Sequence, residues 1–216
     1  MTGIFAFNGN TKHQQIIDTY IKRLAIDTVV ESGTLHGFTT AYFAERVKEV
    51  YTVEIQEKSY RMARNLLRQF RNVHQELGAS PAYFNTLLPT LDGRKILFYL
   101  DAHWFEPWPL FEEMNAIAKH IGKRAVVLID DFQVPNSRCR FDQYGGVINN
   151  FATSEPYFNK IYGERGYVYD YLGGDATQEF IINESELDSD TLPFYLQSYK
   201  GKPITITGKI IVYAKE

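Results

Sequence analysis

The sequence predicts an α/β fold in which a doubly wound, mostly parallel sheet carries helices on both faces. Five apolar or β-branched runs alternate with five segments of helical character between residues 11 and 131, and this alternation is typical of parallel sheets. Two later runs, at 167–172 and 209–214, predict a late antiparallel strand pair at the sheet edge. The length of 216 residues suits one domain.

We expect an N-terminal arm and helix over 1–27, with the first ten residues as a loose arm and Thr11 as the helix cap. The core is expected over 28–131, and a lid loop with the C-terminal strands over 132–216. The run at 95–100 is almost wholly apolar, as in a strand buried on both faces. The predicted strands of the core are 28–31, 50–55, 73–77, 95–100 and 125–129. The predicted helices are 11–24, 41–47, 57–70, 83–91 and 110–121.

Beyond the core, residues 132–146 are rich in glycine and polar residues and are expected to form a loop. Residues 147–162 are expected to be helical, with an interruption near Pro156. The acidic segment 183–190 is expected to be a further loop.

Composition excludes several classes of function. The net charge of -3 and the pI of about 6.0 disfavour nucleic-acid binding. The single cysteine, Cys139, excludes an intrachain disulfide and a cysteine-based zinc site. No apolar run approaches the 18 residues of a membrane span, and no secretory signal is visible. We therefore expect a cytoplasmic protein without membrane contact. The sequence leaves open whether the protein forms a homodimer.

The stretch from Thr28 to Thr40 has the pattern of a strand, a tight turn and a helix N-terminus. Glu31 ends the strand, and Gly33 and Gly37 follow four residues apart. Glycine has no Cβ and accepts positive φ, so such a turn lets the backbone approach a ligand. A glycine-containing turn without any ligand is the alternative.

Four predicted strands end in acids, which are Glu31, Glu54, Asp101 and the pair Asp130–Asp131. In open parallel sheets, ligands bind beyond the carboxyl ends of the strands, so these acids are expected to meet in one crevice. Glu54 follows the turn by about twenty residues, where an acid accepts hydrogen bonds from both hydroxyls of a ribose. An acid in the turn itself would repel a pyrophosphate and suits a ligand with an ammonium or a sulfonium group.

With these features the sequence resembles the class I S-adenosylmethionine-dependent methyltransferases, whose fold is Rossmann-like. Glu31 to Gly37 matches their first motif, and Glu54 matches their ribose-binding acid. More narrowly, Asp101 and the pair Asp130–Asp131 resemble the metal-dependent sugar O-methyltransferases of the macrocin and aminocoumarin type. The resemblance implies S-adenosylmethionine as cofactor, held by Glu31, Ser32, Gly33, Gly37, Glu54, Ile55, Ala79, Ser80 and Asp101.

Three aspartates, Asp101, Asp130 and Asp131, are the candidate ligands of a magnesium ion. Carboxylates gathered in one crevice do not all stay ionised unless a positive group lies among them, and Mg²⁺ prefers oxygen ligands. Such an ion would lower the pKa of a bound hydroxyl. In the alternative, the Asp130–Asp131 pair caps the next segment and Asp101 hydrogen-bonds a loop.

Two histidines and three tryptophan or phenylalanine side chains are further candidates. His103 could be a general base beside Asp101 or an additional metal ligand, and a structural role is the alternative. His36 could touch the cofactor carboxylate. Trp104, Phe105 and Trp108 are expected either to form a wall of the acceptor site or to pack beneath the loop.

These observations predict a methyltransferase that moves a methyl group from S-adenosylmethionine to a hydroxyl of a small acceptor. The resemblance favours a sugar or glycosylated metabolite and magnesium assistance. The alternatives are a nicotinamide-dependent oxidoreductase or nucleotide-sugar enzyme on the same fold, and a non-catalytic nucleoside-binding module.

Overall fold

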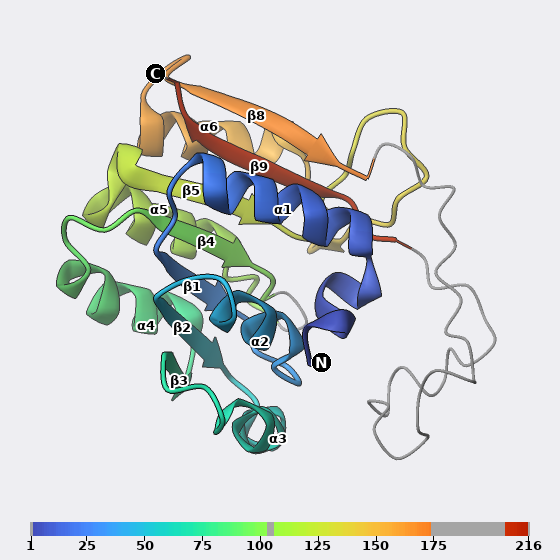
Figure 1. The fold of residues 1–216 in the computed structure, drawn as a ribbon. Coiled ribbons are helices and arrows are strands. Elements are labelled where there is room, and N and C mark those ends of the chain that lie inside the picture. Colours follow the sequence, from blue (N-terminus) through green and yellow to red (C-terminus); the bar gives the residue numbers. More distant parts are fainter. Residues whose placement is uncertain (1, 103–105, 174–205, 216) are drawn as a thin grey trace.

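The computed structural model describes residues 2–102, 106–173 and 206–215 of the chain (Figure 1). Its main sheet has seven strands in the order β3-β2-β1-β4-β5-β9-β8. The first five are parallel to one another, and β9 is antiparallel to both of its neighbours. The strands are β1 (Thr28–Ser32), β2 (Glu49–Glu54), β3 (Val73–Leu77), β4 (Ile96–Leu100), β5 (Ala125–Ile129), β8 (Tyr167–Leu172) and β9 (Lys209–Ala214). The predicted fold class is confirmed.

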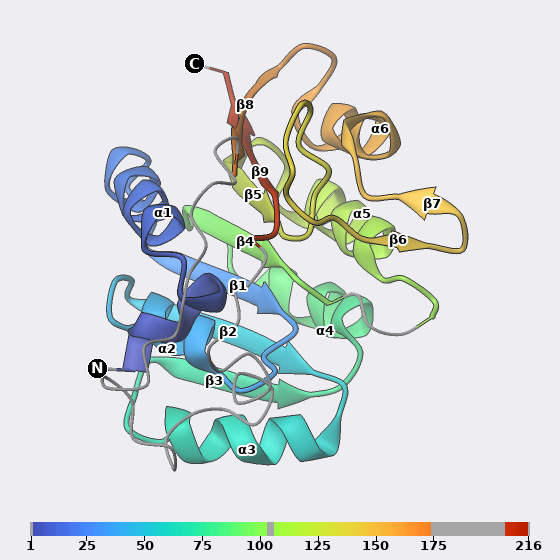
Figure 2. The same cartoon turned by 90° about the vertical axis from the view of Figure 1, so that its right-hand side faces the viewer.

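Helices cover both faces of this sheet. The short helix η1 and helices α1 and α2 lie on one face, α4, α5 and α6 lie on the other, and α3 packs beside α2 near β3 (Figure 2). The central strands β1, β4 and β5 are buried along their whole length because both faces are covered. The helices are η1 (Thr2–Gly9), α1 (Thr11–Arg23), α2 (Phe38–Ala44), α3 (Glu57–Leu67), α4 (Ser80–Leu87), η2 (Leu88–Thr90), α5 (Leu110–His120), η3 (Gly122–Arg124) and α6 (Phe151–Tyr162).

The prediction of a loose N-terminal arm is wrong. Residues 5–7 of η1 are buried, and the Phe7 ring meets the rings of Tyr42 and Tyr99 edge-on, with centroids 5.2 Å and 5.5 Å apart. Burying an aromatic ring among other rings stabilises this segment although it has no regular amphipathic pattern. The cap of α1 also differs, because the Asn10 side chain and not Thr11 accepts a hydrogen bond from the backbone N–H of His13, at 3.0 Å.

The segment after the core also departs from expectation. A two-stranded hairpin, β6 (Gln143–Tyr144) with β7 (Val147–Ile148), occupies part of the predicted loop and the start of the predicted helix. Helix α6 begins only after Asn150, whose side chain forms a capping box with Thr153. Pro156 lies inside α6 without interrupting it. The predicted loop at 183–190 lies outside the described residues.

The two late strands are confirmed, and their register matters for the site. In the β5–β9 pair Ile129 lies opposite Ile210, so Lys209 at the start of β9 lies beside Asp130 at the end of β5. The chain thus brings its C-terminal strand to the same edge of the sheet at which the strand-end acids gather.

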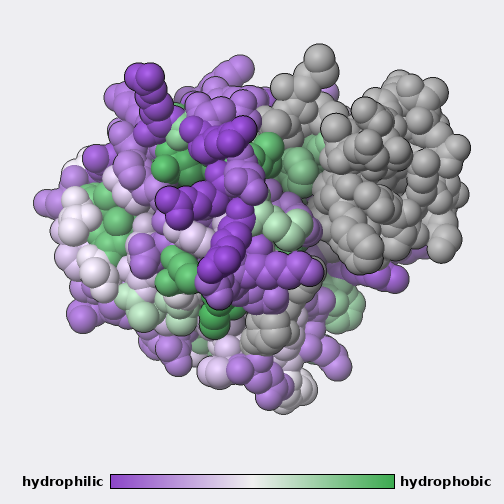
Figure 3. All heavy atoms as spheres, turned by 90° about the horizontal axis from the view of Figure 1, so that it is seen from below, coloured by the Kyte–Doolittle hydropathy of each residue, from purple (hydrophilic) through white to green (hydrophobic). Residues whose placement is uncertain are grey.

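The surface is mixed in character. On the face seen in Figure 3, hydrophobic residues form separate small patches among hydrophilic ones. Within residues 2–102, 106–173 and 206–215, no helix combines the length and the apolar character that a membrane span needs.

Candidate functional site

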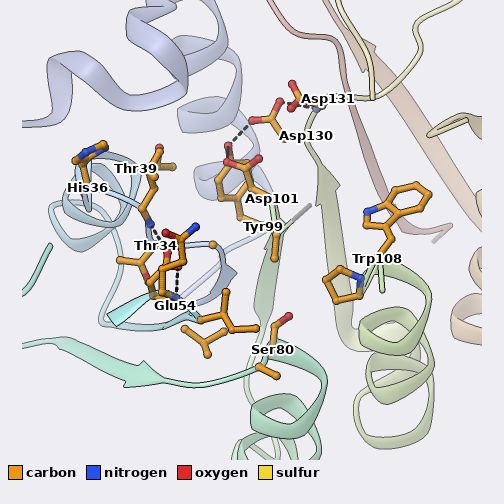
Figure 4. Close-up of a pocket in the computed structure, with 18 of the residues that line it drawn as sticks. Thr34, His36, Thr39, Glu54, Ser80, Tyr99, Asp101, Trp108, Asp130 and Asp131 are labelled. Carbon is orange, nitrogen blue, oxygen red and sulfur yellow. Dashed lines mark hydrogen bonds between the residues drawn. The ribbon is translucent and has the colours of Figure 1, made fainter. Parts of the chain in front are cut away.

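A cavity of about 700 Å³ opens beyond the carboxyl ends of the parallel strands (Figure 4). It lies where β1 and β4 are neighbours, which is the point at which the strand order reverses. We distinguish two sides of this cavity. The turn side comprises Gly33 to Gly37, Glu54, Ile55, Ala79 and Ser80, and the lysine side comprises Tyr99, Asp101, Asp130, Thr207 and Lys209.

The two glycines of the turn line the cavity, and each has positive φ, +84° at Gly33 and +81° at Gly37. A Cβ on Gly33 would lie 2.8 Å from the backbone oxygen of Asp101, and one on Gly37 would lie 3.1 Å from Cγ of Leu67. The need for glycine therefore comes from the chain's own packing against β4 and α3, in addition to any ligand.

Glu54 presents its carboxylate at the cavity, as predicted, and is held there by the backbone. Its Oε2 accepts a hydrogen bond from the N–H of Leu35 and its Oε1 accepts one from the N–H of Gln56, both at 2.8 Å. A carboxylate has about four lone-pair sites, so these two bonds leave capacity for the hydroxyls of a ligand. The carboxylate is only 7% exposed, and its orientation is fixed before a ligand arrives.

Glu31 lies behind the turn and does not line the cavity, which corrects the expectation that it faces a cationic ligand. Its Oε2 accepts hydrogen bonds from the hydroxyls of Thr40, at 2.5 Å, and Thr52, at 2.7 Å. Burial raises the pKa of Glu31 to about 7, although the two threonine hydroxyls act in the opposite direction. Ser32 is likewise fully buried, and its Oγ accepts from the N–H of Asp101 at 3.3 Å.

The remaining predicted residues of the turn side line the cavity together. Ile55 is 57% exposed and lines the cavity with its large apolar side chain. Ala79 and Ser80 face it at the start of α4. Together they form a partly apolar edge next to the Glu54 carboxylate, and a flat heterocycle attached to a ribose would fit such an edge.

On the lysine side, the Tyr99 hydroxyl connects two carboxylates. It lies 3.0 Å from Oδ2 of Asp101 and makes a short hydrogen bond to Oδ2 of Asp130 (Figure 4). Tyr99 is buried, and burial together with the neighbouring acids Asp101 and Asp130 raises its pKa well above the ordinary value. The hydroxyl therefore keeps its single proton and can donate it to only one carboxylate at a time.

Asp130 also forms a buried ion pair with Lys209. The Lys209 Nζ donates to Oδ1 of Asp130 and, at 3.0 Å, to the hydroxyl of Thr207. The same Oδ1 accepts from the Thr207 hydroxyl at 2.9 Å and from the N–H of Asp131 at 2.7 Å. Burial alone would raise the pKa of Asp130, but the Lys209 ammonium, the Tyr99 hydroxyl and the N–H of Asp131 lower it below its usual range.

The three aspartates do not form the predicted magnesium site. Within the described parts of the chain, no group of three histidine, cysteine, aspartate or glutamate side chains is placed to hold a metal ion. Oδ1 of Asp130 already accepts three hydrogen bonds, one of them from an ammonium group. The residues therefore do not fit a divalent cation on Asp130, because a second positive charge would have to displace Lys209.

The other predicted residues are placed unevenly. His103, Trp104 and Phe105 lie outside the described residues. His36 lines the cavity and is half-buried, and burial lowers its pKa. Trp108 both lines the cavity and packs against Phe111 and Tyr144, with ring centroids 5.0 Å and 5.4 Å away, so both of its predicted roles are compatible with its position.

Several residues of the site escaped the sequence analysis. The sequence predicted Lys209 only as the first residue of a strand and gave it no function. A lysine directly before the buried apolar run Ile210–Val212 is nevertheless unusual. Tyr99 was hidden inside an apolar strand. Phe5, Phe7 and Asn8 of η1 line the cavity but carried no signal, because they lie far from it in sequence.

The cavity lining is acidic. Among the described residues, the charged side chains of the lining are one arginine, Arg140, and six acids, which are Glu54, Asp101, Glu106, Glu112, Asp130 and Asp131. Even with Asp130 neutralised by Lys209, the surplus of carboxylates favours a cationic ligand over an anionic one. The preference for a cationic ligand therefore comes from the acids that line the cavity, and Glu31 is not one of them.

No protein-family model matches the sequence, and no curated protein sequence matches it. Solved structures do match. An O-methyltransferase from Bacillus cereus in complex with SAH is 13% identical with a TM-score of 0.60, over 94% of this chain and 81% of that chain. The O-methyltransferase TomG from Streptomyces achromogenes, involved in tomaymycin synthesis and in complex with SAM, is 15% identical with a TM-score of 0.56, over 95% and 80%.

A third match is a precorrin 8w decarboxylase from Methanobacterium thermoautotrophicum, 14% identical with a TM-score of 0.50, over 93% of this chain and 90% of that chain. Proteins with different names thus share this architecture, as is common for widespread folds. At such identities the likeness establishes the fold. The chain has the Rossmann-like fold of the class I S-adenosylmethionine-dependent methyltransferases.

Proposed function

We propose that the protein is an S-adenosylmethionine-dependent methyltransferase that acts on a hydroxyl of a small acceptor. The observation that carries the proposal is the Glu54 carboxylate, which two backbone N–H groups hold at the cavity where β1 and β4 meet. A carboxylate at the end of the second strand suits the two hydroxyls of a ribose. Solved structures with this fold contain SAH or SAM.

The charge of the cavity separates this cofactor from a dinucleotide. S-adenosylmethionine carries a sulfonium and an ammonium and no phosphate, whereas a nicotinamide dinucleotide brings a pyrophosphate. In the part of the lining that the structure describes, six acids against one arginine favour the former. The N–H of Leu35 in the turn is already bonded to Glu54 and so is not free to hold a phosphate oxygen.

The chain's own groups also suit proton removal from a hydroxyl. When held by Glu54 and the turn, the cofactor would supply an electrophilic methyl group to the acceptor oxygen, and the electron pair of its C–S bond would be left on sulfur. Asp101 lines the cavity and is the group that we assign to accept the hydroxyl proton. Tyr99 can donate to Asp130 while Asp101 is ionised, and its oxygen can accept from Asp101 once the proton has arrived.

The sugar or glycosylated acceptor stays part of this proposal and is supported by the sequence resemblance alone. Magnesium assistance is left out of it, because the residues around Asp130 do not fit the ion. In the same proposal, His103 is a second candidate base, and the acceptor is a small hydroxylated molecule.

Isothermal titration with S-adenosylhomocysteine and, separately, with NAD tests the cofactor. We expect one saturable site for S-adenosylhomocysteine and none for NAD. Release of S-adenosylhomocysteine in the presence of a panel of hydroxylated sugars and catechols then tests the transfer. Binding of NAD without binding of S-adenosylhomocysteine would overturn the proposal in favour of an oxidoreductase.

A further inference from the structure

We propose that Lys209 is the built-in cation of the lysine side and that methyl transfer in this protein needs no divalent metal ion. The inference rests on the proposed function for its reaction and on the described contacts of Lys209 for its chemistry. Lys209 is a positioning residue in this scheme, since it contacts Asp130 and does not line the cavity itself.

The Lys209 ammonium is buried and forms an ion pair with Asp130. Its side chain is 1% exposed, and that of Asp130 is 6% exposed. A buried ammonium without a partner is unfavourable. Because water is excluded from both groups, separating the pair would leave two buried charges without partners. The positive charge that we expected among the strand-end acids is thus supplied by the chain.

The groups that surround Lys209 Nζ suit a single positive charge. Thr207 accepts one of its hydrogen bonds at 3.0 Å, and the Phe7 ring lies 5.8 Å from Nζ, within the range of a cation–π contact. His13 of α1 is 2% exposed, and burial, followed by the nearby Lys209, lowers its pKa to about 3. A neutral imidazole, an aromatic face and a hydroxyl suit one positive charge and add no second one.

The ion pair also orients groups near the cavity. With Oδ1 of Asp130 held by Lys209, Thr207 and the N–H of Asp131, its Oδ2 is directed at the Tyr99 hydroxyl. That hydroxyl in turn lies 3.0 Å from Asp101 at the cavity wall. Lys209 therefore fixes the orientation of Asp130, and through it that of the Tyr99 hydroxyl, which is the group that lies next to Asp101.

The strand pairing explains why this lysine can reach the acids. Gly208 precedes it, and a Cβ at Gly208 would lie 2.3 Å from the backbone oxygen of Phe132. The N–H of Phe132 donates to the Gly208 oxygen at 2.8 Å. The absence of a side chain at Gly208 thus lets the chain before β9 run against the end of β5, with Thr207 and Lys209 both directed at Asp130.

The test uses Mn²⁺ as a paramagnetic probe of a magnesium site, with the full-length protein saturated with S-adenosylhomocysteine. We expect wild-type protein to bind no more Mn²⁺ than the Asp130→Asn variant does. One Mn²⁺ bound per wild-type chain and lost in Asp130→Asn would overturn the inference. S-adenosylhomocysteine binding in EDTA is measured in parallel, so that a failure of the proposed cofactor is seen separately from a failure of the metal statement.

A gain of function provides the second measurement. Lys209→Ala removes the ammonium and leaves the carboxylate of Asp130 without its counter-charge. We expect this variant to acquire a Mn²⁺ site that the double variant Lys209→Ala with Asp130→Asn lacks, which a purely structural lysine would not produce. A folded Lys209→Ala protein that binds S-adenosylhomocysteine but no Mn²⁺ would contradict the inference. If that variant does not fold, the wild-type comparison still decides it.

Discussion

The two sides of the cavity are built from the same kind of residue in different ways. On the turn side, the Glu54 carboxylate is held by the backbone N–H of Leu35 in the turn after β1 and by that of Gln56, two residues away. On the lysine side, the Asp130 carboxylate is held by side chains from distant strands, including Lys209, 79 residues further along the chain. The turn side therefore needs only β1, β2 and the segment between them, and the lysine side exists only when β5, β9 and η1 have come together.

This difference has a consequence for stability. The Glu54 carboxylate keeps its two backbone partners wherever β1, its turn and β2 are paired. A carboxylate paired with a lysine of another strand loses its partner whenever the late strands detach, and a buried charge without its partner is destabilising. Substitutions on the lysine side should accordingly act mainly on folding, and those on the turn side mainly on ligand binding.

The largest expected effect is that of Phe7→Ala. Phe7 is 4% exposed, packs on Tyr99 and faces Lys209, so it supports the lysine side. Truncating a buried phenylalanine typically costs about 3–5 kcal/mol. We expect that loss in the free energy of unfolding measured by urea denaturation. Phe141→Ala, at a ring that is 39% exposed, is the control and should lose less than about 1 kcal/mol. Equal losses in the two variants would mean that η1 is not part of the core.

Glu31→Gln tests the burial behind the turn. The pKa of Glu31 is about 7 in the folded protein, against an ordinary value of 4.5. Between these values the folded state binds the extra proton, so this group lowers stability progressively as the pH rises through that interval. Two and a half pKa units correspond to about 3 kcal/mol.

The measurement for Glu31→Gln is urea unfolding at pH 5 and at pH 8. We expect wild-type protein to lose about 2.5 kcal/mol more than the variant between the two pH values, because pH 5 already lies above the ordinary pKa of a glutamate. Thr40→Val serves as a second variant, because it removes a hydrogen bond that opposes the shift and should enlarge the loss in otherwise wild-type protein. A pH dependence that is the same in wild type and Glu31→Gln would show that Glu31 is not buried as a neutral acid.

Glu54→Gln should weaken ligand binding with little change in folding. Hydrogen bonds to charged groups contribute about 1.5–3 kcal/mol, which corresponds to roughly 10- to 150-fold in affinity. We expect a loss of this size in the binding of S-adenosylhomocysteine by calorimetry. The matched control is Glu57→Gln on the exposed face of α3, where Glu57 pairs with Arg61, and it should leave the affinity unchanged. An unaffected affinity in Glu54→Gln would remove the observation on which the proposed function rests.

The smallest effect is expected from a pair of glycines on the turn side. Gly33→Ala forces a Cβ to 2.8 Å from the Asp101 oxygen at φ +84°, and we expect a loss of about 1–3 kcal/mol in unfolding free energy. Gly78 also lines the cavity, but a Cβ there meets nothing within 4 Å. Gly78→Ala should change stability by less than about 0.5 kcal/mol, and similar losses at both sites would show that the close approach of β1 to β4 is not the cause.

Most of the sheet could be predicted from the sequence because its signals are local. The apolar run at 96–100 and the acid that follows it are adjacent, and the glycines of the turn come shortly after the strand at 28–31. The N-terminal arm could not be predicted, because Phe7 is stabilised by rings of Tyr42 and Tyr99 that lie far along the chain. The start of α6 was misplaced for another reason, since Asn150 was not recognised as its cap.

The sequence by itself determined that acids would stand at the carboxyl ends of parallel strands, since strand direction and side-chain order are properties of the local chain. Only the tertiary structure decided which acids face the cavity and what charge meets them. Glu31 is buried behind the glycine turn, and Asp130 pairs with Lys209 instead of binding a metal ion. The physical reason is that ionisation and pairing depend on burial and on partners brought in by long-range strand contacts, which no local pattern records.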